Sequence, residues 1–269
     1  MIELSSLPPV ATPEVWEAQL RARATHYGLE HIDLLIDQAS APRQAVWKRR
    51  PLPLNPPQAL LKGTLHHDAT STGPLLLRLE LEADTQSKAL LAIAQSFQRR
   101  PKLLVLISDW DFAQLTEHLR YYLLAQWDGG MKKGVLRYYD PRVFQPVVRQ
   151  LDTPDRQHLL GAGHEWLWID RDGQSMALRD SESAGNPWRL PRADALMLRQ
   201  VDIDLMSAWH QAELYRQEHF LTAKDTGQPS EEAMMARLAQ IQLAADREQL
   251  LSQPQRQAFI RQQLPASQG

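Results

Sequence analysis

The stretch Gly134-Val-Leu-Arg-Tyr-Tyr-Asp-Pro-Arg142 contains a change from one type of secondary structure to another. The β-branched, aliphatic and aromatic residues of 135–139 favour a strand. Asp140 is suited to cap a helix, because its carboxylate can accept hydrogen bonds from free backbone N–H groups, and proline is favoured at the first helical position. The sequence therefore predicts a strand over 135–139 that leads directly into a helix beginning at Pro141.

Two arginines occupy unfavourable positions at this junction. Arg142 stands in the first turn of the expected helix, where the macrodipole disfavours a cation, and Arg137 stands inside a mostly apolar strand. Each positive charge therefore needs an acidic group nearby, and this group could come from either of two places. Either the arginines tie Asp140 and neighbouring loops together, as buried arginines usually do, or the acid belongs to a partner. We expect the partner for Arg142 and a mixed role for Arg137.

Strand-like and helix-like segments alternate on both sides of the junction. Apolar or alternating runs predict strands, and apolar residues spaced three or four positions apart predict helices. The expected strands are 31–36, 74–81, 103–107, 165–169 and 174–178, and the expected helices are 13–27, 86–98, 109–125 and 141–151. Asp172-Gly173 predicts a hairpin between the last two strands. Alternation of this kind predicts an α/β domain of two or three layers around a mostly parallel or mixed sheet.

The sequence changes character after about residue 190. Asp202, Ser230 and Ser252 each begin a segment with helical spacing of apolar residues, and the preceding stretch 180–195 is rich in glycine, proline and aspartate. We therefore predict two domains, an α/β domain over residues 1–190 and a smaller helical lobe over 191–269. The proline-rich stretch 40–73 is predicted to be irregular.

Composition and charge narrow the class of function. The chain has 269 residues, a net charge of −2 and no cysteine, so disulfides and thiolate chemistry are excluded. The charge balance does not indicate nucleic acid or an anionic membrane as the main partner. The first residues show no basic segment followed by an apolar run, and the apolar runs are far too short to span a bilayer. We expect a cytoplasmic protein.

A search for catalytic motifs finds no convincing set. The chain has neither a Gly-x-Ser-x-Gly elbow nor a P-loop. Asp109 and Asp111 could form an acidic metal pair, but a capping role for Asp109 and a favoured first-turn position for Asp111 explain them better. His118 flanks an apolar helix stripe, and His66-His67-Asp68 lies in an irregular loop without an evident companion. We therefore expect no catalysis, no cofactor and no metal.

Several stretches together resemble one protein family. They are His31–Ala39, Gly73–Leu79, Leu103–Ser108, His118-Leu-Arg120, Leu136–Arg142 and Gln157–Gly161 with the strand around Trp166. Their order and spacing are similar to those of the adaptor or effector-chaperone family of the bacterial type VI secretion system, over about residues 30–175. The family more often shows Arg-Phe-Tyr-Asp-Pro-Arg at the junction, so Tyr138 is a departure.

The resemblance implies a role without catalysis. Such a protein holds a toxic effector in the cytoplasm and helps load it onto the spike protein VgrG or a PAAR tip. The implied partner surface contains Arg137, Tyr139, Asp140 and Arg142. His118 and Arg120 would lie nearby if the two strand–helix junctions are adjacent, as successive parallel strands would place them.

The helical lobe is expected to contribute to the choice of cargo. Trp209 and Met234 supply adaptable apolar contacts on helices with long apolar stripes. The alternative is that every stripe packs against the α/β domain.

Two other classes remain open. One is a metal-dependent hydrolase that uses Asp109, Asp111 and His118, and the other is a structural subunit of the secretion apparatus. Tight binding of a divalent metal would favour the first, and stable self-assembly without an effector would favour the second.

Overall fold

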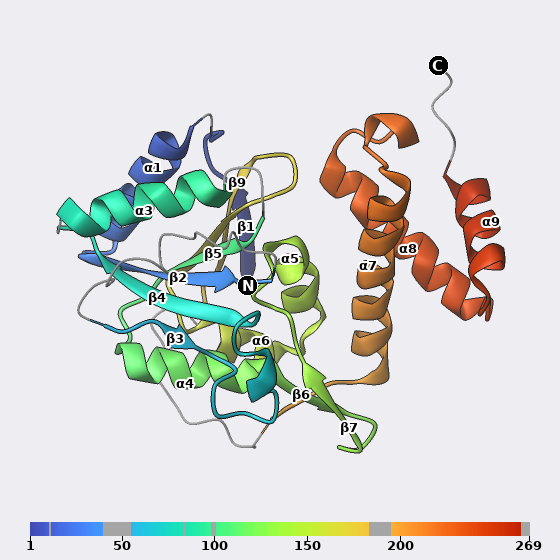
Figure 1. Cartoon of the computed structure of the whole chain (residues 1–269), viewed down its shortest axis with the longest axis horizontal. Helices are drawn as coiled ribbons and strands as arrows, with labels where there is room; N and C mark the ends of the chain where they lie inside the picture. Colours follow the sequence, from blue (N-terminus) through green and yellow to red (C-terminus); the bar gives the residue numbers. More distant parts are fainter. Residues whose placement is uncertain (11, 40–54, 83, 98–100, 183–194, 265–269) are drawn as a thin grey trace. The chain divides into compact units, whose positions relative to one another are not determined.

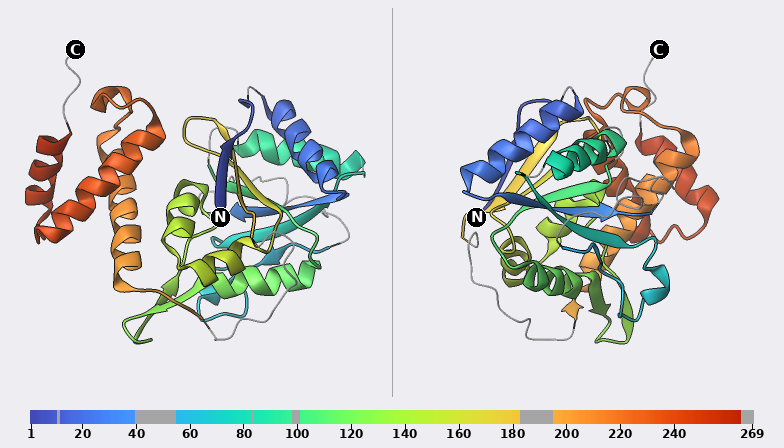
Figure 2. Two further views of the ribbon diagram at one scale, coloured as in Figure 1. Left: turned by 180° about the vertical axis from the view of Figure 1, so that it is seen from behind. Right: turned by 60° about the vertical axis from the view of Figure 1, so that its left-hand side comes forward.

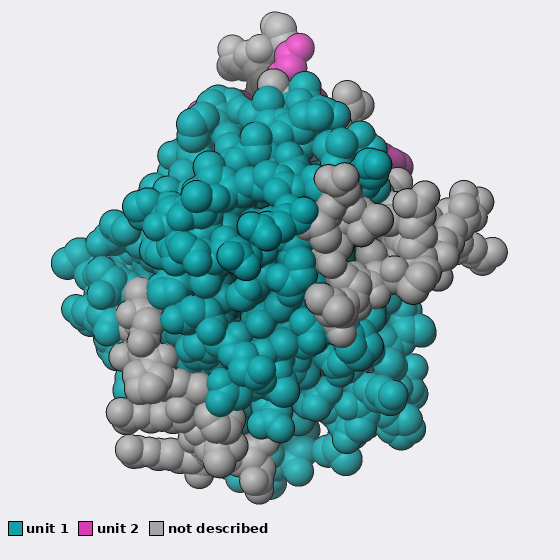
Figure 3. All heavy atoms as spheres, turned by 90° about the vertical axis from the view of Figure 1, so that its left-hand side faces the viewer, with its two compact units in different colours: residues 1–197 teal, residues 198–269 magenta. Residues whose placement is uncertain are grey.

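The computed structural model describes residues 1–10, 12–39, 55–82, 84–97, 101–182 and 195–264. They form two compact units, residues 1–197 and 198–269, which Figure 3 distinguishes by colour. The predicted domain boundary at 190/191 lies outside the described residues, as do most of the predicted linker 180–195 and residues 40–54 of the predicted irregular stretch.

A seven-stranded sheet forms the centre of the first unit, in the order β1-β9-β8-β5-β2-β4-β3. Its strands are β1 (Ile2–Ser6), β2 (His31–Asp37), β3 (Gln58–Ala59), β4 (Pro74–Glu80), β5 (Leu103–Ile107), β8 (Glu165–Ile169) and β9 (Ser175–Asp180). Every neighbouring pair is antiparallel. The predicted hairpin between β8 and β9 is confirmed, and Gly173 in its turn has a φ of 78°.

The prediction of a mostly parallel or mixed sheet is wrong for this sheet. Strand β4, helix α3 (Asp84–Phe97) and strand β5 do alternate along the chain as predicted. However, β2 lies between β4 and β5 and is antiparallel to both. Strands β4 and β5 therefore run in the same direction, as a crossover helix requires, but they are not neighbours. The alternating pattern does not show whether joined strands are adjacent, so it did not reveal the inserted strand.

Helices cover both faces of the sheet (Figures 1 and 2). Helices α1 (Pro13–His26) and α3 pack on one face, where their buried apolar residues meet alternate residues of the central strands. Helices α4 (Phe112–Leu123), α5 (Pro141–Gln150) and α6 (Thr153–Leu160) lie on the other side. On that side Phe144 stacks on Trp166 with ring centroids 5.0 Å apart. Coverage of both faces explains why nearly all of β2 is buried.

A small second sheet contains the two strands that come just before α5 in the chain. Its order is β10-β6-β7, with β6 (Leu124–Trp127) antiparallel to β7 (Lys132–Val135) and parallel to β10 (Leu196–Met197). The predicted strand over 135–139 is therefore displaced, because β7 ends at Val135. Leu136 and Tyr138 lie after this strand and are buried there. The Tyr138 hydroxyl donates to the carbonyl oxygen of Leu119 at 2.7 Å.

The second unit contains three α-helices among its described residues: α7 (Gln200–His219), α8 (Glu231–Arg247) and α9 (Gln253–Gln263). Two short 3-10 turns complete the described elements, η1 (His67–Ala69) in the first unit and η2 (Lys224–Thr226) in the second. The three helices enclose a core of their own. Its buried members are Ala212, Tyr215, Met234, Met235, Leu238, Ala239, Ile241, Ile260 and Leu264.

Candidate functional site

Asp140 forms the N-cap of α5, as the sequence predicts. Its carboxylate oxygen Oδ1 accepts the backbone N–H of Arg142 at 3.1 Å, and Pro141 begins the helix. A turn closed by the N–H of Asp140 on the carbonyl oxygen of Arg137 at 3.0 Å separates this cap from β7. The cap itself is 3% exposed, so its carboxylate needs more than one partner.

Arg142 supplies two of those partners. Its Nε donates to Oδ1 of Asp140 at 2.9 Å and its Nη2 donates to Oδ2 at 2.7 Å. This two-point contact offsets the unfavourable helix dipole from within the chain. The structure therefore matches the alternative in which Arg142 ties the junction together, and the dipole argument no longer calls for an outside partner.

Asp37, at the end of β2, is a second buried carboxylate beside the first. Its backbone N–H donates to the carbonyl oxygen of Lys102 at 2.9 Å, which brings the start of β5 alongside. The Lys102 ammonium then donates to Oδ2 of Asp37 at 2.6 Å. Ile32, Leu34 and Ile36 of β2 face the α1–α3 layer, so the alternation of a strand turns Asp37 toward the opposite side, where α5 begins.

Arg137 joins the two carboxylates. Its Nη2 donates to Oδ2 of Asp37 at 3.0 Å and to Oδ2 of Asp140 at 3.3 Å. Its guanidinium carbon lies 5.7 Å from the centre of the Tyr139 ring, within range of a cation–π contact. We call Asp37, Lys102, Arg137, Asp140 and Arg142 the junction network.

The charges of the network act on the ionisation of Asp140. Burial raises the pKa of this carboxyl, but the hydrogen bond from Arg142 and the positive charges of Arg142, Arg137 and Lys102 outweigh it, so the pKa lies below its ordinary value. Burial, the largest cause, raises the pKa of Tyr139 to about 12. Asp140 is therefore an anion and Tyr139 a neutral phenol near neutral pH.

The remaining predicted residues of this surface have other surroundings. His118 is fully buried on α4, with its ring 4.9 Å from that of Trp110 and 4.7 Å from that of His158. Burial, reinforced by the charge of His158, lowers the pKa of His118 to about 3, so this imidazole is neutral. Arg120 donates through Nε to the carbonyl oxygen of Leu60 at 3.0 Å. The argument that parallel strands bring the two junctions together does not apply to an antiparallel sheet.

The residues of the alternative hydrolase do not converge. Asp111 caps α4 by accepting the N–H groups of Ala113 and Gln114. Asp109 instead lies 3.6 Å from Nε2 of His164, and His118 is enclosed by aromatic rings. Across the described parts of the chain, no three His, Cys, Asp or Glu side chains are placed to hold a metal ion.

The two predicted residues of the helical lobe differ in exposure. Met234 is fully buried in the core of the second unit, so it can contact a partner only if that core opens. Trp209 is partly buried and packs against the same core. The prediction that Trp209 contacts a partner therefore depends on the part of its side chain that stays exposed.

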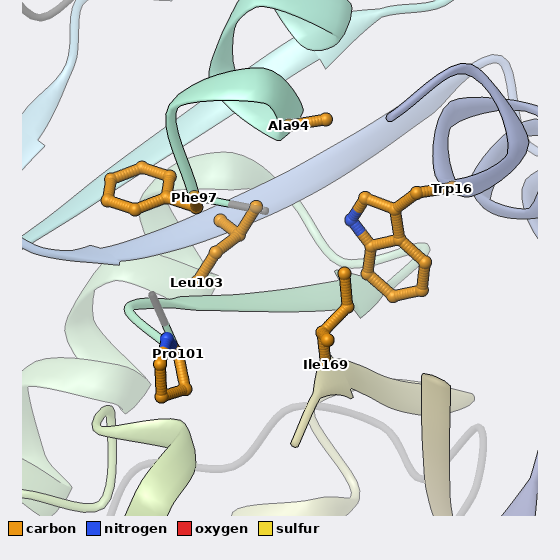
Figure 4. A pocket seen from close by; sticks show the side chains of 6 residues that line it. All are labelled: Trp16, Ala94, Phe97, Pro101, Leu103 and Ile169. Carbon is orange, nitrogen blue, oxygen red and sulfur yellow. The ribbon is translucent and has the colours of Figure 1, made fainter. Parts of the chain in front are cut away.

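A small cavity lies between the sheet and the α1–α3 layer (Figure 4). It is lined by Trp16, Ala94, Phe97, Pro101, Leu103 and Ile169 and holds about 10 Å³. This is room for about one water molecule, so the cavity is not a ligand site.

Sequence reasoning missed Asp37 and Lys102 as members of the site. An acidic residue at the end of an apolar strand was the available signal, because a buried carboxylate requires a cation. The identity of that cation was hidden, because Arg137 stands 100 positions further along the chain.

One of the comparisons with known proteins gives a match. Residues 34–158 match the model of a family described as a domain of unknown function, DUF4123. The match covers less than half of the chain, but it contains all five residues of the junction network. No curated protein and no solved structure shows significant similarity to the chain. Within the described ranges, no helix is both long and apolar enough to cross a membrane.

Proposed function

We propose that this protein is an adaptor that binds a type VI secretion effector. The observation that carries the proposal is the match of residues 34–158 to DUF4123, a family associated with effector adaptors of that system. The matched segment runs from β2 to α6, so it includes the central strands and the whole junction network.

The geometry of the site favours binding of a partner protein over catalysis. In the junction network both carboxylates are already engaged in ion pairs with arginine or lysine, an arrangement that fixes a surface. Arg137 extends from this network with its side chain 47% exposed. A fixed, partly exposed arginine is a common contact residue in protein interfaces.

The finer parts of the proposal concern where and with whom the protein acts. We propose that it works in the cytoplasm, keeps a toxic effector bound there, and helps load that effector onto VgrG or a PAAR tip. The second unit, which lies outside the family match, would then contribute to the choice among effectors.

A bacterial competition assay tests this function. The gene for this chain is deleted in the producing strain, and killing of prey that is sensitive to one effector at a time is measured. We expect killing by one effector to be lost and restored by complementation, while killing by other effectors continues. Unchanged killing by every effector would reject the proposal.

An activity assay tests the absence of turnover. Purified protein is incubated with lipid, peptidoglycan, nucleic-acid and phosphoester substrates, with and without divalent metal. We expect no turnover above the blank. Turnover that Asp109→Ala or His118→Ala abolishes would favour the hydrolase instead.

A further inference from the structure

Arg137 is held by only part of its guanidinium group. An arginine side chain has five N–H donors, two on Nη2, two on Nη1 and one on Nε. Both contacts to Asp37 and Asp140 are made by Nη2. Among the residues that the structure describes, Nη1 and Nε of Arg137 have no hydrogen-bond partner, so three donors remain for another group.

The exposed positive charge of the junction network lies chiefly at Arg137. The side chains of Lys102 and Arg142 are 16% and 19% exposed, whereas that of Arg137 is 47% exposed. Charge complementarity therefore favours an anionic group at this point.

The guanidinium of Arg137 is also fixed in place. Asp37 and Asp140 are both buried and hold its Nη2, and the buried ring of Tyr139 lies beneath it. A side chain that is already ordered loses less rotamer entropy when a ligand binds. A planar fork with free donors fits a carboxylate, which can accept two parallel N–H bonds.

We propose that Arg137 receives the carboxylate of an aspartate or glutamate of the effector, and that Asp37 is the positioning residue that holds Arg137 for this contact. The inference rests on the proposed function, because it takes the effector as the partner. It divides the predicted surface into two parts: Arg137 makes the contact, whereas Asp37, Asp140 and Arg142 support it.

Titration calorimetry measures how tightly purified variants of this chain bind the effector whose delivery depends on it in the competition assay. Arg137→Ala is compared with Arg179→Ala, whose side chain is similarly exposed at 48% and pairs with Glu3 on the surface. We expect Arg137→Ala to weaken binding about 10-fold or more, Arg137→Glu to weaken it further, and Arg179→Ala to leave it unchanged. Arg137→Lys, which keeps the charge without the fork, should lie between wild type and Arg137→Ala.

A double-mutant cycle tests the role of Asp37. We expect Asp37→Asn to weaken effector binding in the wild-type background and to have no further effect on binding when Arg137 is already alanine. A purely structural role would weaken binding equally in both backgrounds.

The outcomes separate this inference from the proposed function. If no effector binds the wild-type chain, the proposed function fails. If the effector binds but Arg137→Ala and Arg137→Glu bind as tightly as Arg179→Ala, the inference fails and the function stands. A loss of binding that only follows the unfolded fraction in thermal melts would likewise overturn the inference.

Discussion

The contact between Arg142 and Asp140 is expected to stabilise the folded protein. Arg142→Ala would leave a buried carboxylate without two of its hydrogen bonds. We expect this change to lower the free energy of unfolding by about 1–3 kcal/mol, as measured by urea denaturation.

The control for Arg142 is again Arg179→Ala. Arg179 and Glu3 form an exposed pair, which is expected to contribute less than about 1 kcal/mol. Equal stability of Arg142→Ala and wild type, together with a loss of effector binding, would show that Arg142 contacts the partner after all.

The depressed pKa of Asp140 predicts an acid-sensitive contribution to stability. A carboxyl whose pKa is lower in the folded than in the unfolded state stabilises the fold above the unfolded value, ordinarily 3.8, and this stabilisation is lost as pH falls through the folded value. We expect the free energy of unfolding to fall less steeply between about pH 5 and 2 in Asp140→Asn than in wild type. Parallel curves for Asp140→Asn and wild type would contradict the assignment.

At the scale of single elements, two helices of the second unit end in an unfavourable backbone conformation. Phe220 after α7 has a φ of 51° and Gln249 after α8 has a φ of 55°. Each is followed by a leucine whose N–H donates back to the last turn of its helix, as in the motif that favours glycine. Both ends therefore carry backbone strain that glycine would relieve.

Phe220→Gly tests this strain. The Phe220 ring is 87% exposed, so little packing is lost, and we expect stability of the second unit to rise by up to about 1 kcal/mol. Gln249→Gly should act in the same direction. Gly227→Ala should lower stability, because Gly227 has a φ of 63°, which strains an alanine. A steric clash plays no part, since no atom lies within 4 Å of the position of the added Cβ. Thermal melting measures all three, and a lower melting temperature for Phe220→Gly would refute the argument.

Local features of these elements could be predicted from sequence, and pairings between distant elements could not. The cap at Asp140 and the hairpin at Asp172-Gly173 depend on residues within a few positions of each other, and the structure confirms both. The direction of the sheet depends on β2 lying between β4 and β5, which no local pattern encodes. The strand predicted over 135–139 failed because burial in a turn and burial in a strand select the same apolar residues.

In the candidate site, too, residues that are neighbours in sequence could be predicted and residues that are distant in sequence could not. Arg137, Asp140 and Arg142 were found because they are neighbours in sequence with opposing charges. Asp37 and Lys102 complete the network only through the pairing of β2 with the start of β5. His118 was expected near this surface only if the two strand–helix junctions are adjacent, and it lies buried between α4 and α6.

At the scale of the whole molecule, the two units have separate cores, one around the large sheet and one among α7, α8 and α9. We expect a fragment of residues 1–197 to fold cooperatively and to retain the junction network, because the network lies wholly within it. Near-ultraviolet circular dichroism and thermal melting would show this. A fragment without a cooperative transition would mean that the second unit is required for the fold of the first.

The same fragment tests the role proposed for the second unit. If α7, α8 and α9 contribute to cargo choice, the folded fragment should bind the effector more weakly than the full chain does. Binding as tight as that of the full chain would place all effector contacts in the first unit.

The central claim is that this chain binds an effector. A titration of the purified full chain with the effector whose delivery depends on this chain in the competition assay tests it most directly. Calorimetry and size-exclusion chromatography with light scattering should show a saturable complex of fixed stoichiometry that persists at physiological salt. Two folded proteins that give no heat of binding and elute separately at every ratio tested would contradict the claim.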